Sequence, residues 1–164
     1  MSRSQTFEDF RCIHCHHIVS NAHLFSGVNN RNHCPYCLWS RHLDLYAAGD
    51  RLSACKASMQ PVALTTKRSR NKYGQGRGEL MLAHLCTDCG DVSINRVAAD
   101  DDTGTMLEVF NLSLVLPIRI RVLLLDNGID ILSSEEKPVL QLQLFGSAAR
   151  IRLKSCNPKR FGVQ

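Results

Sequence analysis

Residues 12–15, Cys-Ile-His-Cys, and residues 31–37, Arg-Asn-His-Cys-Pro-Tyr-Cys, decide how this chain folds. Each segment holds two cysteines separated by two residues, a spacing that lets both thiolates of one tight turn face the same ion. Two such pairs joined by a connection of this length are typical of a structural zinc site. The sequence therefore predicts a first zinc site formed by Cys12, Cys15, Cys34 and Cys37.

A second group of metal ligands is expected further along the chain. Cys55, Cys86 and Cys89 supply three thiolates. His84 is the favoured fourth ligand, because a residue two positions before Cys86 would share a strand face with it. His42 is the alternative, brought in from the segment that follows the first site. The predicted cofactors are two zinc ions, one at each site.

The composition favours a folded chain in a reducing compartment. The 164 residues are 44% hydrophobic, enough for an ordinary core. The sequence has no apolar run of the roughly 18 residues that a membrane span needs, and its N-terminus is polar rather than signal-like. We therefore expect a cytoplasmic location, where eight cysteines favour metal binding over disulfides.

Positive charge is concentrated rather than spread evenly. Zinc held by four thiolates changes the net charge by −2, and zinc held by three thiolates and an imidazole changes it by −1, so +5 falls to +2. The most basic loop lies between two expected strands and contains no acidic residue, which is a pattern suited to phosphate contacts but also to a solvated loop. The predicted nucleic-acid-binding residues are Lys67, Arg68, Arg70, Lys72 and Arg77.

The predicted fold class is α+β, a small two-zinc knuckle or ribbon-like domain with short antiparallel strands and a mainly helical C-terminal extension. Residues 61–66 and 79–85 are expected to form paired strands. Residues 38–50 are expected to form a short helix with Trp39, Leu43 and Tyr46 on one face and Gly49 as its stop. Trp39 and Tyr46 are expected to lie in the core.

The composition changes after residue 102, which places a domain boundary between residues 104 and 105. The extension 105–164 is predicted to contain helices over 106–116, 117–127 and 134–145, followed by a basic tail. Pro117 suits a helix start, Asn127-Gly128 a helix end, and Ser133 with Glu136 a capping box. A β-hairpin remains the alternative over 106–130, because apolar residues alternate from Leu116 to Val122 and Asp-Asn-Gly is a hairpin turn.

The chain resembles the RNHCP domain family, whose name is spelled by residues 31–35. The resemblance covers roughly residues 10–102 and implies a small zinc-finger-like domain without an established activity. The residues that carry it are Phe10, Cys12, Cys15, Arg31, Asn32, His33, Cys34, Pro35, Cys37, Leu38, Trp39, Ser40, His42, Asp44, Gly49, Asp50, Arg51, Cys55, Met59, Pro61, His84, Cys86, Cys89, Gly90, Asn95, Arg96, Ala98, Asp100 and Asp101.

Three functions follow from these patterns, in decreasing order of support. The favoured one is a non-enzymatic zinc protein that binds RNA through the basic loop, with the ribosome as one candidate partner. The alternatives are an adaptor that binds a protein through the helical tail and a His-Asn-His-like nuclease, which both zinc sites disfavour because four protein ligands leave no open position. Arg31, Asn32 and His33 precede a ligand and are expected to donate hydrogen bonds to thiolates.

Overall fold

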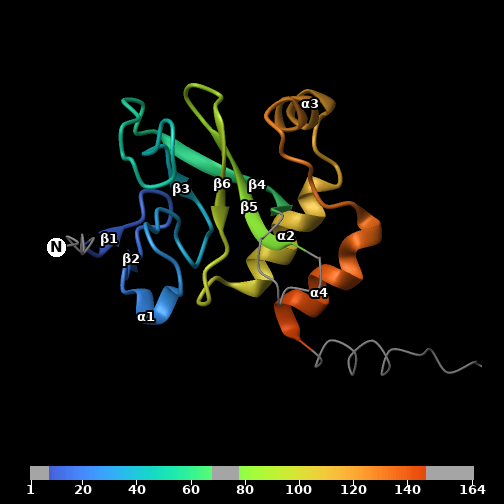
Figure 1. The fold of residues 1–164 in the computed structure, drawn as a ribbon, viewed down its shortest axis with the longest axis horizontal. Coiled ribbons are helices and arrows are strands. Elements are labelled where there is room, and N and C mark those ends of the chain that lie inside the picture. The colour runs from blue at the N-terminus through green and yellow to red at the C-terminus, as the bar shows by residue number, and fades with distance from the viewer. Residues whose placement is uncertain (1–7, 68–77, 147–164) are drawn as a thin grey trace, which may run out of the picture. The chain divides into compact units, whose positions relative to one another are not determined.

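The computed structural model describes residues 8–67 and 78–146. Two short strands, β1 (Phe10–Arg11) and β2 (Ile18–Val19), pair antiparallel beside the first cysteine cluster. A four-stranded antiparallel sheet follows, in the spatial order β3-β4-β5-β6 (Figure 1). Its strands are β3 (Ser40–Arg41), β4 (Ser58–Lys67), β5 (Glu79–Cys86) and β6 (Val92–Arg96).

The expected strand pair is confirmed and is longer than the sequence indicated. β4 and β5 pair from Met59 opposite Cys86 to Lys67 opposite Glu79. The register shifts between Pro61 and Ala63, where proline cannot donate a ladder hydrogen bond and a bulge accommodates it. The core of this sheet is a cluster formed by Val62, Ala63, Ala83, Leu124 and Ile129.

The helices are α1 (His23–Ser26), α2 (Thr103–Ser113), α3 (Ile118–Asp126) and α4 (Lys137–Phe145), and a 3₁₀ turn, η1 (Ser134–Glu136), precedes α4. Residues 106–130 therefore lie mostly in the helices α2 and α3, and the hairpin alternative is wrong. Pro117 lies immediately before α3, and Gly128 just beyond its end has a φ of 72°, which glycine adopts without strain. The predicted capping box of Ser133 and Glu136 is present.

The helix expected over residues 38–50 is wrong. The segment instead forms β3 and a loop whose backbone is bound by two carboxylates. Asp50 accepts hydrogen bonds from the N–H groups of Leu45, Tyr46, Ala47 and Leu52, and these bonds hold its pKa well below the usual range. Aspartate bound to nearby backbone N–H groups offers them an alternative to helical bonds. The side chain of Tyr46 is consequently 85% exposed rather than in the core.

The described chain divides into two compact units at Leu132 and Ser133. Helix α2 packs against β4 within the first unit, burying Met106, Val109 and Phe110. The boundary expected after residue 104 thus differs from this division, which keeps α2 and α3 with the sheet. Among the described residues, no helix is both long and apolar enough to cross a membrane.

Candidate metal centres

The first metal centre is formed by the four predicted cysteines. The Sγ atoms of Cys12 and Cys37 are 3.6 Å apart, and those of Cys15 and Cys34 are 3.5 Å apart. A disulfide requires about 2.05 Å, whereas four sulfurs at 2.3 Å from a tetrahedral zinc ion are separated by about 3.8 Å. The donor set and its spacing therefore fit a zinc ion.

The two turns that supply these cysteines have the same backbone geometry. The N–H of Cys12 donates to the carbonyl of His17, and the N–H of Cys34 donates to that of Trp39, each at 2.9 Å. The residue after each second cysteine adopts a positive φ, 64° at His16 and 61° at Leu38. This geometry curls the turn around its thiolates, so that backbone N–H groups such as that of Cys15 approach the Sγ of Cys12.

The aromatic side chains beside the cysteines are also arranged in the same way in the two turns. His14 lies inside the first turn and stacks on Trp39, which follows the second turn, with ring centroids 4.1 Å apart and planes 5° apart. Tyr36 lies inside the second turn and contacts His17, which follows the first, at 4.7 Å. The two turns are thus related by a local pseudo-twofold arrangement in which the rings of each cover the other.

The second metal centre joins His42 to Cys55, Cys86 and Cys89, and their ligand atoms all lie within 4.8 Å of one another. The Sγ atoms of Cys55 and Cys86 are 3.6 Å apart, and His42 Nδ1 lies 3.3 Å from the Sγ of Cys89. The other ring nitrogen of His42 lies 3.4 Å from a carboxylate oxygen of Asp91. Carboxylates in this position orient zinc-bound histidines, so the site fits a zinc ion with three thiolates and one imidazole.

His42 and Cys55 form a turn of the same kind, with residues 43–54 inserted between the ligands. The N–H of His42 donates to the carbonyl of Ala57 at 2.9 Å, and the N–H of Lys56 donates to that of His42 at 3.2 Å. These bonds match those between equivalent positions of the first centre, and Lys56 has a φ of 56°. A backbone built like a Cys-x-x-Cys turn therefore presents His42 as the ligand.

The expectation that His84 completes the second site is wrong. Its ring is fully buried, with Nε2 donating to the Leu38 carbonyl at 2.7 Å and Nδ1 accepting from the Asn95 amide at 3.1 Å. Burial lowers the pKa of His84 to about 4, so the ring is neutral. Both nitrogens are occupied, and the residue instead ties β5 to the turn of the first centre.

The thiols of the two centres differ in acidity. Burial raises the pKa of the Cys34 thiol to about 11. Burial also acts to raise the pKa of Cys86, but hydrogen bonds from the backbone of Cys89 and Asp88 outweigh it and lower that pKa to about 7. Each centre holds thiols of both kinds, because the pKa of Cys12 in the first centre is also lowered and that of Cys89 in the second is raised to about 11. Zinc binds the thiolate form, so metal binding at either centre releases protons.

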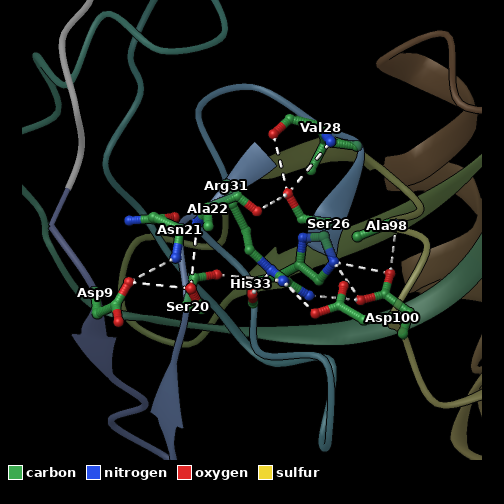
Figure 2. Close-up of polar contacts among 11 residues, drawn as sticks. Asp9, Ser20, Asn21, Ala22, Ser26, Val28, Arg31, His33, Ala98 and Asp100 are labelled. Carbon is green, nitrogen blue, oxygen red and sulfur yellow. Dashed lines mark hydrogen bonds and ion pairs between the residues drawn. The ribbon is translucent and has the colours of Figure 1, made fainter. Parts of the chain in front are cut away.

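Arg31 and His33 bind carboxylates rather than the thiolates that the sequence suggested. Arg31 donates to Asp100 at 2.8 Å and to Asp101 at 3.1 Å, and His33 Nε2 lies 2.9 Å from Asp101. Figure 2 shows Arg31 and His33, from the segment before Cys34, beside Asp100, from the segment after β6. Asn32, the residue between Arg31 and His33, lines clefts on the surface. The network therefore joins the segment before Cys34 to the segment after β6.

Replacing Asp101 with alanine should cost about 3–5 kcal/mol of unfolding free energy. The change leaves a buried His33 and one side of the buried Arg31 without a partner and removes the acceptor of the Ala98 N–H. Asp100 is the matched control, because its side chain is 34% exposed and, among the described residues, binds Arg31 alone, so Asp100→Ala should cost about 1 kcal/mol. Urea unfolding of the zinc-loaded variants measures both, and equal costs would contradict the central role of Asp101.

The cysteines selected from the sequence all come together, but other predicted residues do not. Arg68, Arg70, Lys72 and Arg77 lie outside the described residues, and Lys67 is exposed at the end of β4. Asp91, the partner of His42, was not selected, although its place directly after the Cys86–Gly90 turn was a usable signal. No spacing rule links His42 to Cys55, because the inserted segment separates them.

An α+β domain with two four-ligand cysteine-rich centres is a zinc-finger-like protein. The family model of the RNHCP domain matches residues 7–107, more than half of the chain. The chain therefore belongs to the RNHCP domain family, as the sequence resemblance indicated. Comparisons with curated proteins and with solved structures found no match.

Proposed function

We propose that this protein is a non-enzymatic, cytoplasmic RNA-binding protein in which two zinc centres support a basic β-ribbon. The observation that carries the proposal is that one strand pair, β4 and β5, links the basic residues to the second zinc centre. β4 and β5 are the two longest strands among the described residues. Lys67 ends β4, the other four predicted RNA contacts follow it in the sequence before β5, and the far end of β5 is the zinc ligand Cys86. The second zinc centre therefore anchors the end of the strand pair opposite Lys67.

A polar cleft at the Lys67–Glu79 end of the ribbon adds to this support. It has a volume of about 540 Å³, and its lining includes Lys67, the amides Asn29, Asn30 and Asn32, the carboxylate of Asp44, and Arg96 paired with Glu79. Amide side chains offer both donors and acceptors, and lysine neutralises phosphate. The cleft is therefore chemically suited to the backbone and sugar of a strand that reaches the ribbon.

Binding to single-stranded RNA should weaken steeply with salt. Each phosphate contact contributes about 0.7 to the slope of log K against log salt, so changing Lys67, Arg68, Arg70 and Lys72 together to alanine should lower that slope by up to about 3. Fluorescence anisotropy of labelled RNA between 50 and 200 mM salt measures it. Arg119→Ala, an exposed arginine on α3, is the control. An unchanged slope in the fourfold variant would remove the loop from the interface.

Two features support a binding role over catalysis. Each centre offers four protein ligands, while a catalytic zinc ion keeps one position for water or substrate. His33, the histidine of the Asn-His pair, is already bound to Asp101. Incubating the zinc-loaded chain with RNA and DNA in the presence of Mg²⁺ tests the nuclease alternative, and cleavage lost in His33→Ala would favour it.

The adaptor alternative is favoured by one specific observation on α3. Ile118, Val122 and Leu125 are all exposed and follow the i, i+4, i+7 spacing by which one helix face docks into a groove. Binding of a protein partner through this face should be lost in a Val122→Asp variant. In the unchanged protein, that binding should be insensitive to salt. Purification after crosslinking, with bound RNA and bound protein separated, decides between the two functions.

A further inference from the structure

A cleft of about 230 Å³ lies against the first metal centre. Its walls come from β1, from the turn before Cys34 and from β3, and they include Arg11, Trp39, Arg41 and Arg51. A volume below the usual 300–1,000 Å³ of small-molecule sites suits one planar group rather than a long ligand. The cleft combines an aromatic ring with several guanidinium groups.

The charge of this cleft is positive. Arg31 also lines it, but Asp100 and Asp101 neutralise that side chain. The other charged residues of the lining are Arg11, Arg41 and Arg51 and one acid, Glu8. Guanidinium binds phosphate in a planar, two-pronged manner and also stacks on aromatic faces.

The arginines and the ring are held in place by different elements. Arg11 donates through Nε to the His16 carbonyl at 3.0 Å, and Arg51 donates to the Arg31 carbonyl at 3.3 Å. Trp39 is fixed by its stack on His14, which does not line the cleft, so the indole surface that borders the cleft is one that His14 leaves uncovered. Arg41 is exposed on β3, directly across the strand from Ser58.

We propose that this cleft binds a single unpaired nucleotide, with its base against Trp39 and its phosphate at Arg41 and Arg11. The inference rests on the proposed RNA-binding function and assigns to it a second contact beside the first zinc centre. A base within a duplex has no free face to offer, so the ligand is single-stranded. A free mononucleotide shares this chemistry, and the experiment separates the two sources.

The same arginines have an alternative role, which is to offset the −2 charge of a zinc ion held by four thiolates, since Cys12 also borders the cleft. If they served only the metal, removing one would reduce zinc retention and leave nucleotide binding unchanged. The nucleotide proposal makes the opposite prediction for Arg41. The Arg41→Ala variant should keep two zinc ions per chain and should bind nucleotide more weakly.

Trp39 is the sole tryptophan of the chain, so intrinsic fluorescence reports directly on the cleft. The zinc-loaded full chain is titrated with eight-nucleotide oligouridine and oligoadenosine, with UMP and AMP, and with inorganic phosphate. The oligonucleotides should quench Trp39, and the mononucleotides should do so only at higher concentration. Arg41→Ala should weaken quenching about tenfold, whereas Arg119→Ala should leave it unchanged.

A second variant keeps the test independent of fluorescence. Trp39→Ala should weaken binding of labelled oligonucleotide about five- to 150-fold, the equivalent of one stacked base, and Trp39→Phe should restore most of it. One outcome would overturn this inference and leave the proposed function standing. In that outcome RNA binding depends on salt and on the basic loop, but it does not change Trp39 fluorescence, and Arg41→Ala binds RNA as tightly as the unchanged protein. Quenching by mononucleotides without any binding of RNA would overturn the RNA function and assign the cleft to free nucleotides.

Discussion

Removal of zinc should unfold the first compact unit. A structural zinc site contributes about 10–16 kcal/mol of coupled folding energy, which equals or exceeds the roughly 5–15 kcal/mol net stability of a typical domain. The apolar cluster at the first centre illustrates the dependence, because two of its three buried members, Cys12 and Cys34, are themselves ligands and the third is Val19. Without the ion, few apolar side chains remain in this cluster to stabilise the two turns.

Circular dichroism and thermal unfolding measure this loss. Excess EDTA with a reducing agent should abolish the cooperative transition of the zinc-loaded chain, and added zinc should restore it. EDTA already saturated with zinc is the control for effects of the chelator itself. A chelated protein that is shown by elemental analysis to hold no metal, yet keeps its spectrum and its transition, would contradict a metal-dependent fold.

The second large effect should come from His42. Mutating a residue that hydrogen-bonds to a zinc ligand lowers zinc affinity by about 10–100-fold. His42→Ala removes a ligand itself, so it should lower the zinc affinity of the second site by more than about 100-fold. His42→Cys should retain the metal with four thiolates. Substitution with Co²⁺ provides the readout, because the visible d–d bands report on the number and type of ligands.

His84 is the matched comparison, since it is a buried histidine two residues before the ligand Cys86 and is not part of the second centre. His84→Ala should leave the cobalt spectrum of the second site unchanged and should instead lower the unfolding free energy by about 2–4 kcal/mol, because the buried Leu38 carbonyl loses its donor and a cavity forms. A changed spectrum in this variant, together with an unchanged one in His42→Ala, would reverse the assignment.

The cysteine pairs could be recognised from the sequence because a two-residue spacing constrains where both thiolates point. The strand pair β4 and β5 was also recognisable from its β-branched and apolar residues, and helix α3 from Pro117 and Asn127-Gly128. In each case the signal is local: it depends on residues that are neighbours in the chain.

The errors concern residues whose partners are distant in sequence. His84 has the right face and spacing for a ligand, but its ring is occupied by Leu38 and Asn95. Arg31 and His33 find their carboxylates at Asp100 and Asp101, which no local pattern links to them. The segment 38–50 has helical spacing, yet the carboxylates of Asp44 and Asp50 bind its backbone N–H groups.

The interrupted turn between His42 and Cys55 also sets an order of events during synthesis. All ligands of the first centre lie between residues 12 and 37, while those of the second extend from His42 to Cys89. At roughly 5–20 residues per second, the ribosome completes the second set about 3–10 s after the first. The four ligands of the first centre are therefore all made before the second set is complete, because Cys86 and Cys89 follow β4 and β5 in the chain. The N-terminal turns thus have a full ligand set while most of the sheet has still to be synthesised.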